Sequence, residues 1–368
     1  MANAKATRHY GVYDPWLFYT TFTLVGLGLL MIFSATAQSS NGLFYLRRQV
    51  LFVIVGTVFM VTASRIPYRC WKKLAVPFMV ITLALVIATL FPVIGHKIKG
   101  ASRWIRIGGF SVQPTEFLKV ALVMLMAASL SKKAENVRKF EIGVLPHLFL
   151  LAVIAFVVIR QPDFGTVVIL CAVTWIMLFL GGARLLHIVG PLLPLAIILA
   201  VFVTGAGYRM ARIKAFMDPW AVEKNGGYQV TRSLMAYGSG GITGKGLSNS
   251  ELKLKHLPEC HTDFIFPILG EELGLIGVLS ALGLYVLLLT RGFLAAMRCP
   301  DMFGCLLAVG ICAVIGLQII MNLAVTMGIL PPTGLTLPLM SYGGSSLLCT
   351  MTGIGIVLNV AREEAHVR

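Results

Sequence analysis

The chain has 368 residues, of which 57% are hydrophobic and 12% charged, and its formal net charge at pH 7 is +16. Soluble domains carry roughly 25% charged residues, so this composition excludes an ordinary soluble protein and predicts an integral membrane protein. The seven cysteines form no C-x-x-C pair, which argues against a zinc site and against a disulfide framework.

Apolar segments long enough to cross a bilayer, which takes about 20 residues, recur along the whole chain. We expect an all-α polytopic bundle of about ten transmembrane helices, forming one membrane domain over residues 1–368. The first segment is expected to be a retained anchor, because no small-residue cleavage site follows it. The expected spans are residues 15–36, 49–65, 74–94, 116–130, 144–159, 165–182, 185–205, 264–290, 302–327 and 334–360.

The distribution of Lys and Arg predicts that both termini are cytoplasmic. With that orientation the inner loops and tails hold 15 of these residues, and the outer loops also hold 15, eight of them in residues 206–263. Without that long loop the inner side has 15 against seven, as the positive-inside rule requires. The basic excess in the long outer loop indicates either an anionic ligand or contact with lipid head groups.

Three segments outside the regular spans have compositions of their own. Residues 95–115 are too polar to span and too apolar for a plain linker, so we expect a short amphipathic or re-entrant element at the outer interface, or a structured surface loop. Residues 206–263 form a large extracytoplasmic loop, in which residues 228–237 have apolar positions at helical spacing. Residues 328–346 are rich in Pro and Gly, which predicts broken or re-entrant backbone covered by protein or lining a wet cavity.

Charged residues inside or beside the predicted spans mark candidate functional positions, because such groups are costly in hydrocarbon. Glu116 and Lys119 have i, i+3 spacing and therefore share a helix face, either as structural glue or as part of a site. Asp163 lies near Arg160 in a Pro-containing turn at the outer interface. It either binds local backbone N–H groups or lines a substrate cavity.

The segment HLPECHTDFIFPILGEELGLIG at residues 256–277 places one carboxylate, Asp263, where a polar run meets a long apolar span. Asp263 or its neighbour Thr262 is typical of a helix N-cap, a role that is compatible with catalysis. On an ideal helix, at about 100° per residue, Glu271 lies about 80° round from Asp263 and Glu272 about 180°. We therefore expect Glu271 to face the same cavity as Asp263 and Glu272 to pair elsewhere.

Taken in order, the motifs of this chain resemble those of the SEDS (shape, elongation, division and sporulation) family of bacterial membrane proteins. The resemblance covers nearly the whole chain and is closer to the division branch than to the elongation or sporulation branch. Pro267, where relatives often have Ala, is a minor departure. The matching motifs are KGASRWIRIG…QPTEFLK at 99–119, QPDFGT at 161–166, YRMARIKAFMDPW…GYQVTRSLMAYGSGG at 208–241, GKGL at 244–247, LPECHTDFIFPILGEELGLIG at 257–277 and GILPPTGLTLPLMSYGGSS at 328–346.

The resemblance implies a peptidoglycan glycosyltransferase that polymerises lipid II on the outer side of the bacterial cytoplasmic membrane, for septal wall synthesis in cell division. The implied partners are a class B penicillin-binding transpeptidase, other division proteins and the membrane, with no nucleic acid. In that family the acid of the HTDFIF motif is the catalytic residue, which here is Asp263. The residues predicted to bind substrate or support the site are Glu116, Lys119, Asp163, Lys97, Arg103, Arg209, Arg212, His261 and Glu271.

The chemistry of the residues agrees with this implication. A lipid-linked pyrophosphate is already a good leaving group, so one general base for the acceptor 4-hydroxyl is enough, unlike the two carboxylates of most glycosidases. We expect Asp263 to be that base in an inverting displacement that forms a β-1,4 link. Cations would stabilise the departing pyrophosphate, and Lys97, Arg103, Arg209 and Arg212 are the candidates. No cofactor is predicted with certainty; a divalent cation, Mg²⁺ or Mn²⁺, would suit the same task, and its ligands stay unknown.

Three other functions stay open from the sequence: a flippase that moves lipid II across the bilayer, an elongation-type polymerase, and a scaffold that only recruits the transpeptidase. A flippase needs polar groups spread through the depth of the membrane, whereas the candidate groups here collect at the outer face. A scaffold would tolerate the loss of Asp263. The distribution of polar groups therefore favours an enzyme.

Overall fold

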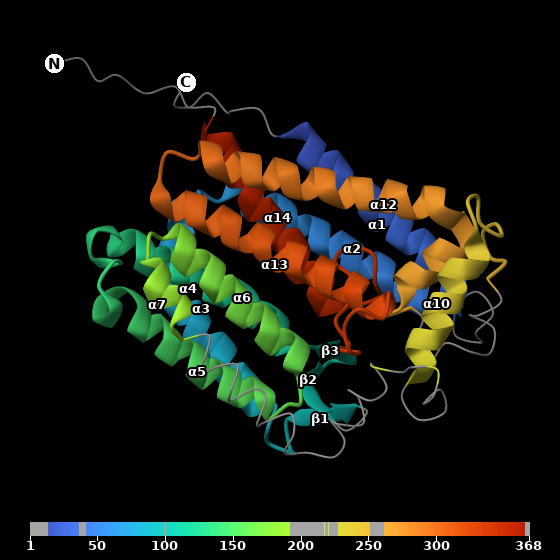
Figure 1. Cartoon of the computed structure of the whole chain (residues 1–368), viewed down its shortest axis with the longest axis horizontal. Helices are drawn as coiled ribbons and strands as arrows, with labels where there is room; N and C mark the ends of the chain where they lie inside the picture. Colours follow the sequence, from blue (N-terminus) through green and yellow to red (C-terminus); the bar gives the residue numbers. More distant parts are fainter. Residues whose placement is uncertain are drawn as a thin grey trace.

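The computed structural model describes residues 14–36, 42–98, 101–191, 217, 220, 227–250 and 261–364. Within these ranges the chain is a bundle of long helices with one small sheet at one end (Figure 1), which confirms the predicted all-α membrane fold. Eight of the described helices are long and apolar enough to cross a membrane, and Phe164–Leu180 is a shorter apolar helix. The expected span 185–205 lies mostly outside the described residues, so the number ten stays a prediction.

The observed helix boundaries agree best with the expected spans where one span is a single uninterrupted helix. The expected spans 15–36 and 302–327 match α1 and α13 to within a residue, whereas the span expected at 334–360 begins too early. The described α-helices are α1 (Pro15–Thr36), α2 (Gly42–Arg65), α3 (Tyr68–Ala88), α4 (Pro114–Lys132), α5 (Leu145–Ile159), α6 (Phe164–Leu180), α7 (Leu185–Val189), α10 (Tyr228–Gly240), α12 (Ile265–Arg298), α13 (Met302–Thr326) and α14 (Gly344–Glu364). A π-helical turn, Phe140–Val144, leads directly into α5, and together they form one of the eight spans.

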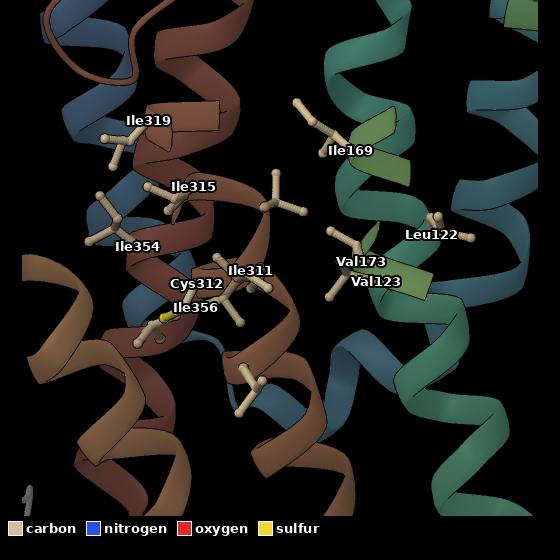
Figure 2. Packing of buried hydrophobic residues seen from close by; sticks show 14 of the residues in the cluster. Leu122, Val123, Ile169, Val173, Ile311, Cys312, Ile315, Ile319, Ile354 and Ile356 are labelled. Atoms are coloured by element: carbon tan, nitrogen blue, oxygen red, sulfur yellow. The ribbon is translucent and has the colours of Figure 1, made fainter. Parts of the chain in front are cut away.

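Helix α13 is the centre of the bundle. It is the most buried of the eight spanning helices, and it contacts α4, α6, α12 and α14. Figure 2 shows buried side chains at this contact, with Val123 and Val173 on one side and Ile311 of α13 on the other. Since lipid tails are as apolar as these side chains, close packing rather than escape from water holds such helices together. Gly310 permits that packing, because a Cβ there would lie 2.5 Å from the Val123 side chain.

A three-stranded antiparallel sheet occupies the segment that was expected to be amphipathic or re-entrant. The turn between its second and third strands consists of Gly108 and Gly109, whose φ angles are 55° and 83°. Two positive φ angles in a two-residue loop are the signature of a type I′ hairpin. The strands, in spatial order, are β1 (Gly95–Ile98), β2 (Ala101–Ile107) and β3 (Phe110–Val112).

The chain between α13 and α14 is non-helical and yet packs inside the bundle, where Met340 is completely buried. Side chains of neighbouring helices bind its backbone. Gln49 of α2 donates to the Ser341 carbonyl over 3.3 Å, and the Tyr285 hydroxyl of α12 donates to the Pro338 carbonyl over 2.6 Å. The prediction of broken backbone covered by protein is confirmed. This backbone is tolerated inside the bundle because polar side chains of other helices supply the hydrogen bonds that a helix would make internally.

Helix α12 is broken at Gly274, whose φ of 64° and ψ of −163° lie in a region that essentially only glycine adopts. Residues 241–246, the exchange loop, fill the break. Two carbonyls of α12 before the break accept hydrogen bonds from N–H groups of the exchange loop. Two N–H groups of α12 after the break donate to carbonyls of the exchange loop. In an unbroken helix these carbonyls and N–H groups would pair with each other. These bonds run from Lys245 N to Glu271 O (3.0 Å), from Gly246 N to Glu272 O (3.0 Å), from Leu275 N to Gly241 O (3.0 Å) and from Ile276 N to Ile242 O (3.2 Å).

Candidate active site

Asp263 lies in the turn of residues 261–264 that leads into α12, and it is partly exposed. The Thr262 hydroxyl donates to Asp263 Oδ1 over 2.9 Å. The backbone carbonyl of Asp263 accepts a hydrogen bond from Nδ2 of Asn322, on α13, over 2.9 Å. Phe264 occupies the N-cap position of α12, so the expectation that Thr262 or Asp263 is the N-cap is wrong. The turn presents a carboxylate at the helix entrance while its backbone is anchored to a central helix.

The rings of Tyr45, His261 and Tyr342 form an aromatic cluster beside this turn. The centroids of Tyr45 and His261 lie 4.7 Å apart, and Tyr342 lies 5.3 Å and 5.5 Å from the two. The Tyr342 N–H also donates to the His261 carbonyl over 2.9 Å. Because the three rings come from α2, from the turn before α12 and from the segment before α14, the cluster fixes the Asp263 turn against two other parts of the bundle.

Arg48 is a basic residue of this region that the sequence analysis did not single out. It follows Tyr45 by one turn of α2, and its Nη2 donates to the Gly109 carbonyl of the β2–β3 hairpin over 2.9 Å. Its guanidinium carbon lies 5.1 Å from the centroid of the Phe110 ring, within the range of a cation–π contact. The available signal was the pair Arg47-Arg48 just before an apolar run, since a cation at a span end is placed to face a ligand or a head group.

Glu116 and Lys119 form a buried ion pair on α4. The distance from Lys119 Nζ to Glu116 Oε1 is 2.8 Å, and the two side chains are 1% and 5% exposed, so the shared helix face predicted from their spacing is confirmed. Both line a small cavity of about 20 Å³ between α4, α13 and α14. Gln318 of α13 lines it too, and its Nε2 is buried without a hydrogen-bond partner among the described residues.

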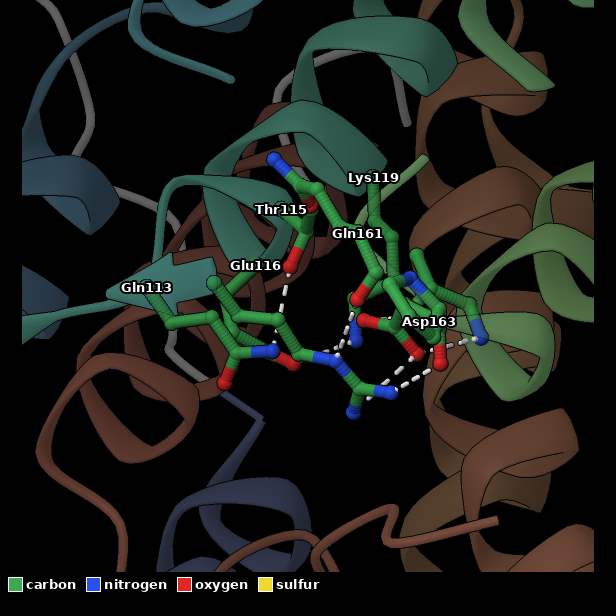
Figure 3. Close-up of polar contacts among 9 residues, drawn as sticks. Gln113, Thr115, Glu116, Lys119, Gln161 and Asp163 are labelled. Carbon is green, nitrogen blue, oxygen red and sulfur yellow. Dashed lines mark hydrogen bonds and ion pairs between the residues drawn. The ribbon is translucent and has the colours of Figure 1, made fainter. Parts of the chain in front are cut away.

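Asp163 and Arg103, both predicted site residues, are brought together at the start of α6. Asp163 is the N-cap of that helix and accepts from the Thr166 N–H over 3.4 Å and from the Thr166 hydroxyl over 3.0 Å. Arg103 Nη1 lies 3.6 Å from Asp163 Oδ1, and the same guanidinium donates to the carbonyls of Gln161 (3.1 Å) and Pro162 (Figure 3). The predicted binding of local backbone N–H groups by Asp163 is confirmed, and Arg103 is engaged by this turn.

Glu271 and Glu272, both fully buried, lie in the part of α12 before its break and bind different partners. Glu271 accepts hydrogen bonds from Lys245 Nζ (3.1 Å) and from the Ser250 hydroxyl (2.5 Å), both in the segment after α10. The Ser34 hydroxyl of α1 donates to the Glu272 carboxylate over 2.6 Å. Glu272 therefore has its own partner, and Glu271 holds the segment after α10. The expected place of Glu271 in a cavity with Asp263 stays a prediction.

The tyrosine at position 237 connects α10 to the central helix of the bundle. Tyr237, on α10, hydrogen-bonds through its hydroxyl with the Thr326 hydroxyl at the end of α13 over 3.0 Å. Burial raises the pKa of the Tyr237 phenol, because a phenolate would lose its hydration. The phenol therefore stays protonated at neutral pH, and α10 is held to α13 by an uncharged bond.

Three of the candidate cations lie outside what the structure describes. Arg209 and Arg212 belong to undescribed residues, and Lys97 is described only through its backbone in β1. Their assignment to a pyrophosphate stays a prediction.

A divalent cation was considered for the same task. Among the described residues no group of three or more His, Cys, Asp or Glu side chains is placed to hold a metal ion. Mg²⁺ is usually held by one or two carboxylates together with substrate phosphates and water, so a full protein cage is not required for such an ion. The described side chains do not form such a cage, and we derive no step through a metal.

Comparison with known proteins places the chain among membrane proteins of wall synthesis and cell division. Residues 15–366 match the family of FtsW, RodA and SpoVE, which is described as "Cell cycle protein". The probable peptidoglycan glycosyltransferase FtsW of Trichlorobacter lovleyi is 41% identical over 354 residues, 95% of this chain and 93% of that protein. Stage V sporulation protein E of Bacillus subtilis is 38% identical over 359 residues, with coverages of 96% and 98%.

Two solved structures share the fold over almost their whole length. One belongs to a study of how a peptidoglycan synthase complex coordinates polymerization and crosslinking; the TM-score is 0.81 at 31% identity, and the match covers 96% of this chain and 98% of that one. The other is the crystal structure of the rod shape determining protein RodA of Thermus thermophilus, with a TM-score of 0.68, 29% identity and the same coverages.

Proposed function

Because this chain belongs to the FtsW, RodA and SpoVE family of cell cycle proteins over residues 15–366, we infer that it is a peptidoglycan glycosyltransferase. The observation that carries this conclusion is the near-complete match to FtsW relatives named for that activity, at 41% identity for the example above. The FtsW name of these relatives agrees with the resemblance of this chain's motifs to the division branch.

The substrate that we propose is lipid II, which supplies both the growing glycan and the added disaccharide. The protein would act on the outer side of the bacterial cytoplasmic membrane, with both termini in the cytoplasm. We propose a class B penicillin-binding transpeptidase as its partner, together with other division proteins. The likeness to a chain of a peptidoglycan synthase complex supports that partnership.

Asp263 is the group to which we assign the chemistry. Its carboxylate takes the proton of the acceptor 4-hydroxyl while that oxygen forms a bond to the anomeric carbon of the donor. The bond from the anomeric carbon to the phosphate oxygen breaks, and its electron pair leaves with the undecaprenyl pyrophosphate. Attack from the opposite face inverts the anomeric centre and gives a β-1,4 link. Partial exposure suits this role, because the carboxylate has to be ionised and reachable.

Cationic groups must stabilise the charge that develops on the pyrophosphate. Arg103 already binds Asp163 and the α5–α6 turn, so it would act by shaping the site or with its remaining exposed part. Arg48 lies one turn of α2 after Tyr45 of the aromatic cluster and binds the β2–β3 hairpin, so it adds a positive charge between the two. We include it with Lys97, Arg209 and Arg212 among the groups that meet the phosphates.

The test compares Asp263→Asn with the unchanged protein and with Glu135→Gln, which alters an exposed acid of the inner loop. Each is purified in detergent with its transpeptidase and incubated with lipid II, and glycan strands are separated by electrophoresis. We expect polymer from the unchanged protein and from Glu135→Gln, and none from Asp263→Asn at an unchanged melting temperature. Glycan synthesis by Asp263→Asn would refute the assignment of the base. A flippase or a scaffold would make no polymer in any of the three preparations.

A further inference from the structure

Asn322 lies near the end of α13 and is 1% exposed. Its Nδ2 donates two hydrogen bonds to backbone carbonyls of separate segments: to Asp263 over 2.9 Å and to Leu335 over 2.7 Å. Both targets are acceptors, so the amide has to present its NH₂ group to them; the reverse orientation would set Oδ1 against two carbonyl oxygens. Asn322 therefore joins the turn that carries Asp263 to the non-helical segment before α14.

The helical ladder of α12 begins after Asp263. Phe264 is the N-cap of this helix, so Asp263 precedes the first residue whose carbonyl takes part in the ladder. The residue four positions after Asp263 is Pro267, which has no N–H. The hydrogen bond from Asn322 therefore fixes the Asp263 backbone from another helix, at a point that the ladder of α12 does not reach.

We propose that Asn322 is a positioning residue of the glycosyltransferase: it holds the backbone of Asp263 so that the carboxylate meets the acceptor hydroxyl. The inference rests on the proposed function, because it assigns Asn322 a task only if Asp263 is the base. Asn322 acts on the anchor of the reacting side chain and takes no proton itself. A carboxylate displaced by about 1 Å from a productive geometry can lose about 100-fold in rate.

Asn359 provides a matched control at another helix junction. It is a buried Asn of α14 whose Oδ1 accepts from the Tyr68 N–H over 2.8 Å and whose Nδ2 donates to the Ser64 carbonyl over 2.9 Å. Asn359 therefore joins α14 to the turn between α2 and α3, as Asn322 joins α13 to the Asp263 turn. Leu has the branched shape of Asn, although it is larger, and it has no polar atom. Asn322→Leu and Asn359→Leu therefore each remove two side-chain hydrogen bonds at a helix junction.

The experiment measures initial rates of glycan synthesis against lipid II concentration for both variants with the transpeptidase present. Asn322→Leu is expected to lower kcat by about 10- to 100-fold with KM within threefold of the unchanged protein. Asn359→Leu is expected to lower the melting temperature by a similar amount and to keep kcat within threefold. Equal kcat values for the two variants at equal folded fractions would overturn the inference.

Asp263→Asn is assayed in parallel. If Asp263→Asn is inactive while Asn322→Leu is fully active, only this inference fails; if Asp263→Asn is active, the proposed base fails first.

Discussion

Replacing Lys119 with Met leaves the Glu116 carboxylate buried without its charged partner, and we expect the free energy of unfolding to fall by about 3 kcal/mol. Breaking a buried pair by removing one member typically costs 3–5 kcal/mol. The lower end applies here because the neighbouring cavity of about 20 Å³ has room for about one water molecule beside the lone charge. Glu116→Gln, which strands the ammonium group instead, should cost a similar amount.

The double variant Glu116→Gln, Lys119→Met removes both charges, and we expect it to cost about 1 kcal/mol, because no uncompensated charge is left in the core. The coupling energy of the cycle is then several kcal/mol. Unfolding is followed in detergent by the intrinsic fluorescence of the five tryptophans during a denaturant titration. Additive losses, with the double variant as unstable as the sum of the single ones, would show that the two side chains do not stabilise each other and would refute the reasoning.

Two further pairs of substitutions test other parts of the structure. Gly274→Ala should lower the melting temperature and expose Lys245 to trypsin, because the residue has φ 64° and an added Cβ would lie 2.3 Å from the Gly244 backbone nitrogen. Gly283→Ala, where a Cβ meets nothing within 4 Å, should leave the protein as stable or more so; equal melting of the two variants would contradict the strain argument. Asp163→Ala should cost about 1 kcal/mol more than Asp163→Asn in denaturant unfolding, because Asn still caps α6 and Ala does not, and equal costs would count against the cap.

The helical spans were predictable because hydrophobicity and length alone set them. The prediction was less accurate where backbone geometry rather than composition decides. Residues 334–343 are apolar enough to continue a span, but Leu339 has a φ of 66° and the backbone is held by side chains of other helices. The β2–β3 hairpin did carry a local signal: Ile105-Arg106-Ile107 alternates in polarity and is followed by Gly108-Gly109, a two-glycine turn typical of a hairpin.

The charged residues of the candidate site were predictable from the sequence, but the residues that hold their backbone in place were not. Spacing alone placed Glu116 and Lys119 on one helix face, and a single acid before a long apolar run identified Asp263. Asn322 carries no comparable signal, because a lone Asn in an apolar helix can bond in many ways, and its two acceptors lie 59 and 13 positions away along the chain. The break at Gly274 was not predicted either, because placing residues 263–272 at 100° per residue assumes an unbroken helix.

The break in α12 has a practical consequence for anyone who labels this protein. The exchange loop faces outward and looks like an ordinary place to insert an epitope or a fluorophore, but four of its backbone groups complete a membrane helix whose first turn follows Asp263. An insertion there would disturb the part of α12 that follows Asp263, and the inserted label would then report on a perturbed structure. Tags are better carried by the inner connection at residues 133–139, which lies on the opposite side of the bundle by the predicted topology and contains none of the candidate site residues.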